Sequence, residues 1–123
     1  MKFRTLMIIK AIVCLGFGPF LLFAPGPLLN LLGVEFNSGA AFMGREYGAA
    51  LVGNLLLTWF AKDAGPSDAR RAIILDLFIY DAIGLVVSLL VMFSGGMNLL
   101  GWGIVGVYLF FTVGFGYFWL TKK

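Results

Sequence analysis

The sequence has no histidine, a single cysteine and few charged residues, and each shortage excludes a class of protein. Without histidine there is no histidine-ligated haem, no histidine-based zinc site and no histidine general base. Cys14 alone forms neither an internal disulfide nor a CxxC redox pair. Charged residues make up 12% of the 123 residues and hydrophobic residues 61%, which excludes a soluble globular domain and a disordered chain. The remaining class is an integral membrane protein.

Long apolar stretches dominate what is present. Four of them approach the roughly 20 residues that a bilayer-spanning helix needs, and they cover residues 5–23, 40–61, 71–93 and 98–120. Gly65 and Pro66 are suited to ending the second helix, and Ser67 to capping the third. Because the second and third connections are short, consecutive helices should be antiparallel neighbours. We therefore expect a single all-α transmembrane domain over residues 1–123, folded as an antiparallel four-helix bundle.

The first connection differs from the other two because it contains an apolar segment of its own. Pro27 suits the first turn of a helix and Gly33 suits its end, while residues 28–32 are too few to cross a membrane. We expect a short helix lying at the membrane interface between the first two spans. The alternative is an apolar loop that rests on lipid.

The basic residues predict the orientation. All but one of the nine lysines and arginines fall at the N-terminal end, in the second connection or at the C-terminus, and the other two connections have none. Because cytoplasmic segments carry the excess of lysine and arginine, both termini should be cytoplasmic in a multi-pass protein of the cell inner membrane. The exception, Arg45, lies inside the second span. The basic residues therefore reflect topology and do not indicate nucleic acid binding.

Polar residues inside the spans are candidates for function because they are costly in hydrocarbon. The binding or ion-pair candidates are Arg45, Glu46, Asp76, Tyr80, Asp81 and Ser88. Asp81 lies near the middle of its span and shares a helix face with Ser88, and Asp76 shares a neighbouring face with Tyr80. Arg45 is the expected partner of Asp81, while Lys10 is expected to extend to the inner surface.

These residues allow two interpretations. Asp81, Glu46 and Arg45 build a proton- or ion-coupled site, of which a groove for an anionic lipid or a quinone-like ring near Arg45 is a variant. Alternatively, an internal ion pair fixes the register of the helices. No metal site, cofactor site or catalytic residue set is recognisable in the sequence.

Glycines at helical spacing predict close helix packing. Gly44 and Gly48 continue a face that begins at Ala40, and small residues four apart let two helices approach closely. In the fourth span, Gly103, Gly106 and Gly114 share one face. We expect these glycines to pack within the bundle or against another subunit.

Three features resemble those of small DoxX-like four-helix proteins of the bacterial inner membrane. They are the Pro25-Gly26-Pro27 connection, the sequence Gly-Arg-Glu-Tyr-Gly-Ala at 44–49, and the Gly-Pro turn at 65–66. The layout extends over nearly the whole chain. Because most such proteins have no assigned activity, the resemblance implies a fold, and it transfers no residue role.

Three functions follow as hypotheses. The first is a non-enzymatic accessory or structural subunit, with the lipid bilayer and either further copies or a larger membrane complex as partners. The second is a small homo-oligomeric transporter or channel that uses Asp81 and Arg45. The third is a membrane enzyme acting on a lipid or quinone, for which Tyr47, Glu46 and Arg45 are the only clustered candidates.

Overall fold

The computed structural model describes residues 2–121, and this part of the chain is all-helical. Its five helices are α1 (Phe3–Phe23), α2 (Pro25–Leu31), α3 (Ser38–Ala61), α4 (Asp68–Phe93) and α5 (Gly101–Thr121). The expected helical class is confirmed, and the short helix expected in the first connection is present as α2. Lys122 and Lys123, which entered the orientation argument, lie outside the described residues.

Local side chains and one glycine set the helix boundaries. The Asn37 side chain accepts a hydrogen bond from the backbone N–H of Ala40 at 2.8 Å and caps α3. Ser67 caps α4 in the same way, through the N–H of Arg70 at 3.1 Å, as the sequence predicted. After α2, Gly33 adopts a φ of 75°, a left-handed conformation that glycine takes without steric cost.

Within the described residues, three helices are long and apolar enough to cross a membrane: α1, α4 and α5. They correspond to the first, third and fourth spans expected from the sequence. The second expected span coincides with α3, which has 24 residues but is not among these three. The physical reason is its polar content, because Arg45, Glu46 and Asn54 interrupt its apolar residues. The structure thus supports a multi-pass membrane protein at the level of three apolar helices.

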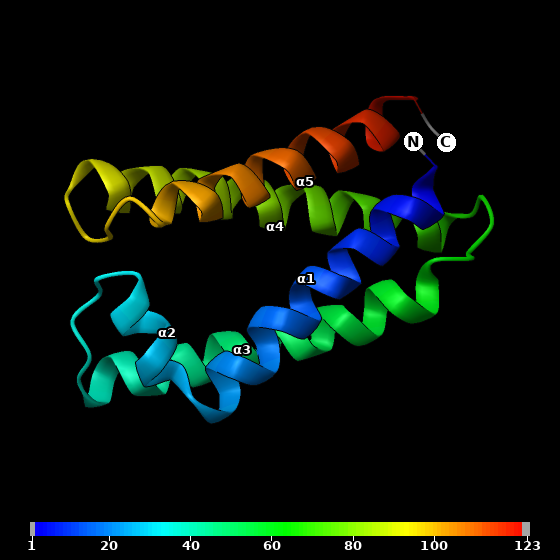
Figure 1. Ribbon diagram of the computed structural model, residues 1–123. Coiled ribbons are helices and arrows are strands. Elements are labelled where there is room, and N and C mark those ends of the chain that lie inside the picture. Colours follow the sequence, from blue (N-terminus) through cyan, green and yellow to red (C-terminus); the bar gives the residue numbers. More distant parts are fainter. Residues whose placement is uncertain (1, 122–123) are drawn as a thin grey trace.

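The long helices form two pairs, α1 with α3 and α4 with α5, and α1 also touches α5 (Figure 1). Both termini and the α3–α4 connection lie at one end of the molecule, which we call the terminal end (Figure 1). The α2 helix and the α4–α5 connection lie at the other end (Figure 1). There the Asn98 side chain donates a hydrogen bond to the carbonyl of Leu31 at 2.8 Å, and the Asn98 N–H donates to Leu32 at 2.8 Å. The two pairs are therefore linked at both ends.

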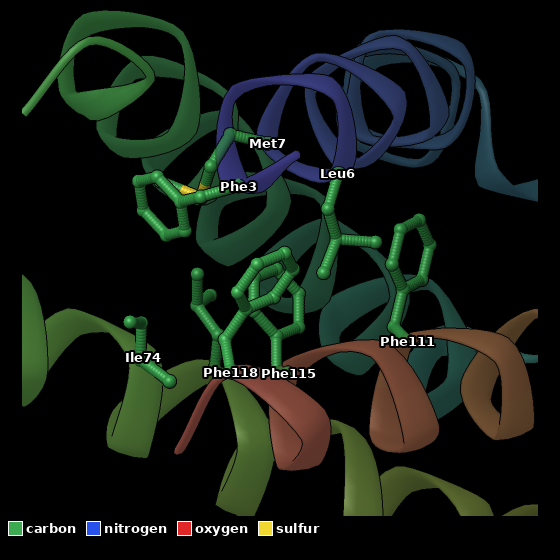
Figure 2. Packing of buried hydrophobic residues seen from close by; sticks show 8 residues of the cluster. Phe3, Leu6, Met7, Ile74, Phe111, Phe115 and Phe118 are labelled. Carbon is green, nitrogen blue, oxygen red and sulfur yellow. The ribbon is translucent and has the colours of Figure 1, made fainter. Parts of the chain in front are cut away.

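An apolar cluster joins the two pairs near the terminal end (Figure 2). Side chains from α1 meet side chains from α4 and α5, and at its centre Leu6, Leu77 and Phe115 are fully buried. The whole cluster comprises Phe3, Leu6, Met7, Ile74, Leu77, Phe111, Phe115 and Phe118. It fills the interior between the terminal end and the middle of the molecule.

Basic side chains connect neighbouring helices at the surface of the terminal end. Arg4 and Asp63 form an exposed ion pair at 2.7 Å. Arg71 donates hydrogen bonds to the carbonyls of Phe118 and Trp119, at 3.2 and 2.9 Å, in the last turns of α5. A cation near the C-terminal end of a helix also complements its dipole.

Glycines permit the close crossing of α1 and α3. A Cβ atom on Gly48 would lie 2.7 Å from the carbonyl oxygen of Gly18, and a Cβ on Gly44 would lie 3.2 Å from Pro25. The backbones of α1 and α3 therefore touch at Gly48, where any side chain would separate them. This contact sets the position of α1 between α3 and the α4–α5 pair.

We predict that Gly48→Ala lowers the free energy of unfolding by about 1–3 kcal/mol, because the added methyl group must push two backbones apart. The measurement is unfolding of the purified protein in mixed micelles. Gly103→Ala is the matched control, because its Cβ would meet nothing within 4 Å. The control should be unchanged or gain up to about 1 kcal/mol from higher helix propensity. Equal destabilisation by both variants would contradict the close crossing.

Candidate functional site

Opposite charges from α1 and α4 meet in the interior. The Nζ atom of Lys10 lies 2.7 Å from Oδ1 of Asp81 and donates a hydrogen bond to it. The two side chains are 3% and 0% exposed. Asp81 stands at the middle of the 26-residue helix α4, so both charges are removed from either end of the molecule. Such a pair persists in an apolar interior because each charge neutralises the other.

This pairing corrects two expectations from the sequence. Lys10 does not extend to the inner surface, and the partner of Asp81 is Lys10 and not Arg45. Arg45 is exposed on α3 and forms no ion pair within residues 2–121. The reason is the position of α1, which lies between α3 and the α4–α5 pair (Figure 1), so that Lys10 on α1 reaches Asp81 on α4.

Aromatic rings complete the surroundings of Lys10. Its Nζ atom lies 4.7 Å from the ring centre of Phe111 and 5.0 Å from that of Tyr80. A desolvated ammonium over such rings gains about 0.5–2 kcal/mol per contact. Cys14, one turn further along α1, is buried beside the pair. The lysine thus has an ionic partner and two aromatic neighbours in the buried interior.

Two polar atoms next to the ion pair have no hydrogen-bond partner among the described residues. They are Oδ2 of Asp81 and the hydroxyl of Tyr80, and both are buried. An ionised carboxylate can accept several hydrogen bonds, and Lys10 uses only the other oxygen of Asp81. A buried polar atom left without a partner costs about 1–3 kcal/mol. The cluster therefore retains an unused acceptor and an unused hydroxyl.

Tyrosine hydroxyls gather beside the ion pair. Tyr47 of α3 and Tyr108 of α5 are hydrogen-bonded to each other through their hydroxyls, and Tyr80 lies close to Tyr47. Tyr108 packs directly on Gly84 of α4, where a Cβ would collide with the tyrosine ring. With Lys10 on α1, all four long helices contribute to this set of polar side chains. We call Lys10, Tyr47, Tyr80, Asp81 and Tyr108 the central polar cluster.

The other polar candidates lie apart from the central polar cluster or at its border. Arg45, Glu46 and Asp76 are exposed on the outside of the helices. Ser88 is buried, two turns beyond Asp81 on the same face of α4. The structure does not bring Tyr47 together with its sequence neighbours Arg45 and Glu46, because its hydroxyl is bonded to Tyr108 across the interior.

The packing glycines divide into two groups. Gly44 and Gly48 lie against α2 and α1, and Gly114 lies against Leu6, where a Cβ would stand 2.9 Å from the leucine side chain. Gly103 and Gly106 have open space around the position of a Cβ. Gly106 borders a shallow apolar hollow on the outside of α5.

Sequence reasoning missed Lys10 and Tyr108 as members of the cluster. A signal for Lys10 was available, because it lies about 10 Å along a helix that begins at Phe3. That depth is large for a lysine at a membrane edge. The signal for Tyr108 was weaker. It shares a helix face with Phe111, but Gly84, on which its ring packs, belongs to another helix and is not related to it by sequence spacing.

The chemistry available to the central polar cluster is proton binding and hydrogen bonding. Within residues 2–121, no three cysteine or acidic side chains come together as a metal site requires. Comparison with known proteins adds no assignment: no protein-family model, no curated protein and no solved structure matches the chain. The geometry of this chain is therefore the basis for its function.

We predict strong coupling between Lys10 and Asp81 in a double-mutant cycle. Lys10→Met or Asp81→Asn alone should each lower the free energy of unfolding by about 3–5 kcal/mol, because each leaves one buried group without its partner. Combining the two substitutions should cost much less than their sum. The measurement is unfolding in mixed micelles.

The exposed Arg45 provides the control for this cycle. Arg45→Met should show no coupling with Asp81→Asn, because the two side chains are not in contact in the structure. Additive behaviour of Lys10→Met and Asp81→Asn, or strong coupling of Arg45 with Asp81, would contradict the pairing.

Proposed function

We propose that the chain is a four-span membrane protein with both ends in the cytoplasm, similar in layout to DoxX-like proteins. The helices α1, α4 and α5 are apolar and long enough to cross. The 24 residues of α3 reach about 36 Å, which exceeds a hydrocarbon core of about 30 Å. The terminal end carries Arg4, Lys62, Arg70 and Arg71, and the excess of basic residues marks a cytoplasmic side.

We infer that its function is to move protons, as a small transporter that works as an oligomer. The observation that carries this proposal is the buried Lys10–Asp81 pair, with Oδ2 of Asp81 and the Tyr80 hydroxyl both buried and without a hydrogen-bond partner among the described residues. A buried ion pair is a weak source of stability, so stability alone does not account for its cost. Ionisable residues within membrane spans commonly belong to ion pathways and proton relays.

A proton suits this interior better than a larger substrate does. It needs no wide channel, because it passes along neighbouring oxygen atoms. In the described part of the chain Oδ2 of Asp81 and the Tyr80 hydroxyl have no hydrogen-bond partner, so a side-chain rotation must first bring them together. Asp81 then accepts a proton at Oδ2 from Tyr80, and Tyr80 regains one from the Tyr47 hydroxyl, so each tyrosine remains neutral after the step. Tyr47 is the most exposed tyrosine of the cluster, at 38%, so the path enters the cluster at this residue. Protonated Asp81 no longer neutralises Lys10, which weakens the link between the two helix pairs.

The apolar cluster blocks the passage of protons between the central polar cluster and the terminal end. It separates the central polar cluster from the terminal end and contains no polar side chain. Transfer across the whole membrane therefore requires α1 to move relative to α4 and α5. Apart from the apolar cluster, the ion pair is the main link between α1 and the α4–α5 pair in the middle of the molecule, so its protonation state controls this movement.

The second candidate function is a non-enzymatic accessory subunit of a larger membrane complex. The exposed Arg45 and Glu46 favour it, because charges on the outside of a membrane helix call for a protein partner. In that case the Lys10–Asp81 pair is purely a structural link.

We predict opposite accessibility for the two ends of the molecule. Leu99→Cys, at a residue 83% exposed in the α4–α5 connection, should react with a membrane-impermeant maleimide in intact cells. Gly65→Cys, in the α3–α4 connection, should react only after permeabilisation. The native Cys14 is 1% exposed and should add little background. Reaction of both variants in intact cells, or of Gly65→Cys alone, would contradict the orientation.

We predict that Asp81→Asn abolishes proton movement. Purified protein in vesicles with a trapped pH indicator should admit protons when a potassium diffusion potential is imposed. Asp81→Asn should lower the rate by about 100-fold or to the level of empty vesicles, because it removes the proton acceptor. Tyr80→Phe should lower it in part. The control is Tyr117→Phe, since Tyr117 is 49% exposed on α5 and lies outside the cluster.

Two outcomes decide between the candidate functions. Proton entry that depends on Asp81 and Tyr80 but not on Tyr117 supports the transporter. A wild-type rate equal to that of empty vesicles, or an unchanged rate in Asp81→Asn, overturns it and favours the accessory subunit.

A further inference from the structure

One face of α3 is left uncovered by the rest of the chain. The helix packs on α1 and α2 with its opposite side and lies at one edge of the molecule (Figure 1). Phe42, Leu56 and Phe60 are 63%, 53% and 78% exposed along this face, and a Cβ on Gly53 would meet nothing within 4 Å. Ala49 is exposed as well. We call Phe42, Ala49, Gly53, Leu56 and Phe60 the outer α3 face.

Two opposite charges border the outer α3 face. Arg45 and Glu46 are exposed, and neither forms an ion pair within the described residues. They lie about 10–12 Å from the start of α3, which places them below the membrane surface if α3 crosses the bilayer. Charges at such depth are costly when they face lipid. Their position therefore requires partners of opposite charge.

The helical geometry makes this face complementary to itself. Successive residues are about 100° apart around a helix, and the line from Phe42 through Ala49 to Phe60 runs between Arg45 and Glu46. One charge thus borders each side of the line. When two parallel copies of α3 meet face to face about a two-fold axis, Arg45 of each copy meets the partner's Glu46 at the same depth. Two identical ion pairs result, one on each side of the contact.

Small residues at the centre allow the helices to come close. Ala49 and Gly53 are four residues apart, a spacing that lets membrane helices pack backbone to backbone. This spacing is separate from the one at Gly44 and Gly48, which faces α2 and α1. The small residues Gly44 and Gly48 thus pack within the chain, whereas Ala49 and Gly53 lie on a face that no described residue covers.

We propose that a second copy of this chain packs on the outer α3 face in parallel orientation, with reciprocal Arg45–Glu46 ion pairs. The occupant is a second copy because the pair of charges is self-complementary in sign, side and depth. This inference does not depend on proton transport, although a dimer is consistent with an oligomeric transporter.

Charge reversal tests the reciprocal pairing. In Arg45→Glu every facing pair becomes acidic, and in Glu46→Arg every pair becomes basic. Each single variant should lose the dimer by about tenfold or more in association constant, because like charges then face each other in a medium of low dielectric constant. The double variant R45E/E46R restores opposite charges and should dimerise as the wild type does. The measurement is native mass spectrometry after extraction in a gentle detergent.

Mixing the single variants gives the sharpest result. A chain carrying Arg45→Glu and a chain carrying Glu46→Arg are complementary to each other at both sites. Coexpressed with different tags, they should form the mixed dimer, although each alone is monomeric. Asp76→Asn is the matched control, since Asp76 is also an exposed acidic residue but lies on α4, and it should leave the wild-type dimer intact. Gly53→Leu should weaken the dimer while unfolding as the wild type does.

Several outcomes would overturn the proposal: a monomeric wild type, a dimer unaffected by Arg45→Glu, or failure of the mixed pair and the double variant to associate. A different protein bound in place of the second copy would also overturn it, while leaving the accessory-subunit function intact. Loss of proton movement in Asp81→Asn has no bearing on this test, so the two proposals fail or stand separately.

Discussion

Desolvation of charge is the constraint on which the rest of this molecule depends. A lysine and an aspartate in the middle of apolar helices are tolerated only if they meet, and Lys10 and Asp81 do so at 2.7 Å. Their contact links the α1–α3 pair to the α4–α5 pair, which also meet through the apolar cluster, the Tyr47–Tyr108 hydrogen bond and the hydrogen bonds of Asn98. The close crossing at Gly18 and Gly48 positions α1 so that Lys10 can reach α4. The pairing of the buried charges thus depends on the close packing of the small residues.

The same constraint separates the charges on the long helices into two sets. Lys10 and Asp81 neutralise each other within the chain, and Oδ2 of Asp81 remains without a hydrogen-bond partner among the described residues. Arg45 and Glu46 have no such partner in the described chain. The first set supports a proposal about chemistry inside the molecule, and the second supports a proposal about association between molecules. A chain with small connections leaves few other places for specific contact.

Much of the secondary structure followed from local patterns in the sequence. Long apolar runs predicted the long helices, Ser67 was identified as a cap, and the proline-rich first connection predicted a short helix. For the second span, the helix α3 forms over the expected residues, but it is more polar than α1, α4 and α5 and is not among the helices apolar enough to cross a membrane. Of the residues in the central polar cluster, the sequence singled out Asp81 for its depth in the span and Tyr80 because it shares a helix face with Asp76. The prediction that Arg45 is the partner of Asp81 was wrong, because depth along a helix does not show which of two cations, Arg45 or Lys10, faces the aspartate.

The sequence by itself determined the helical class, the shortage of metal-binding side chains and the asymmetry of basic charge, because these follow from composition and from spacing along one chain. Only the tertiary structure decided which cation meets Asp81, that Tyr47 and Tyr108 from separate helices share a hydrogen bond, and that Arg45 and Glu46 face outward. The physical reason is that the sequence does not determine how each helix is rotated about its own axis. Periodicity shows which residues share a helix face, but the direction of that face depends on how two backbones cross. Here that crossing is determined by the glycines at 18 and 48, where α1 and α3 touch.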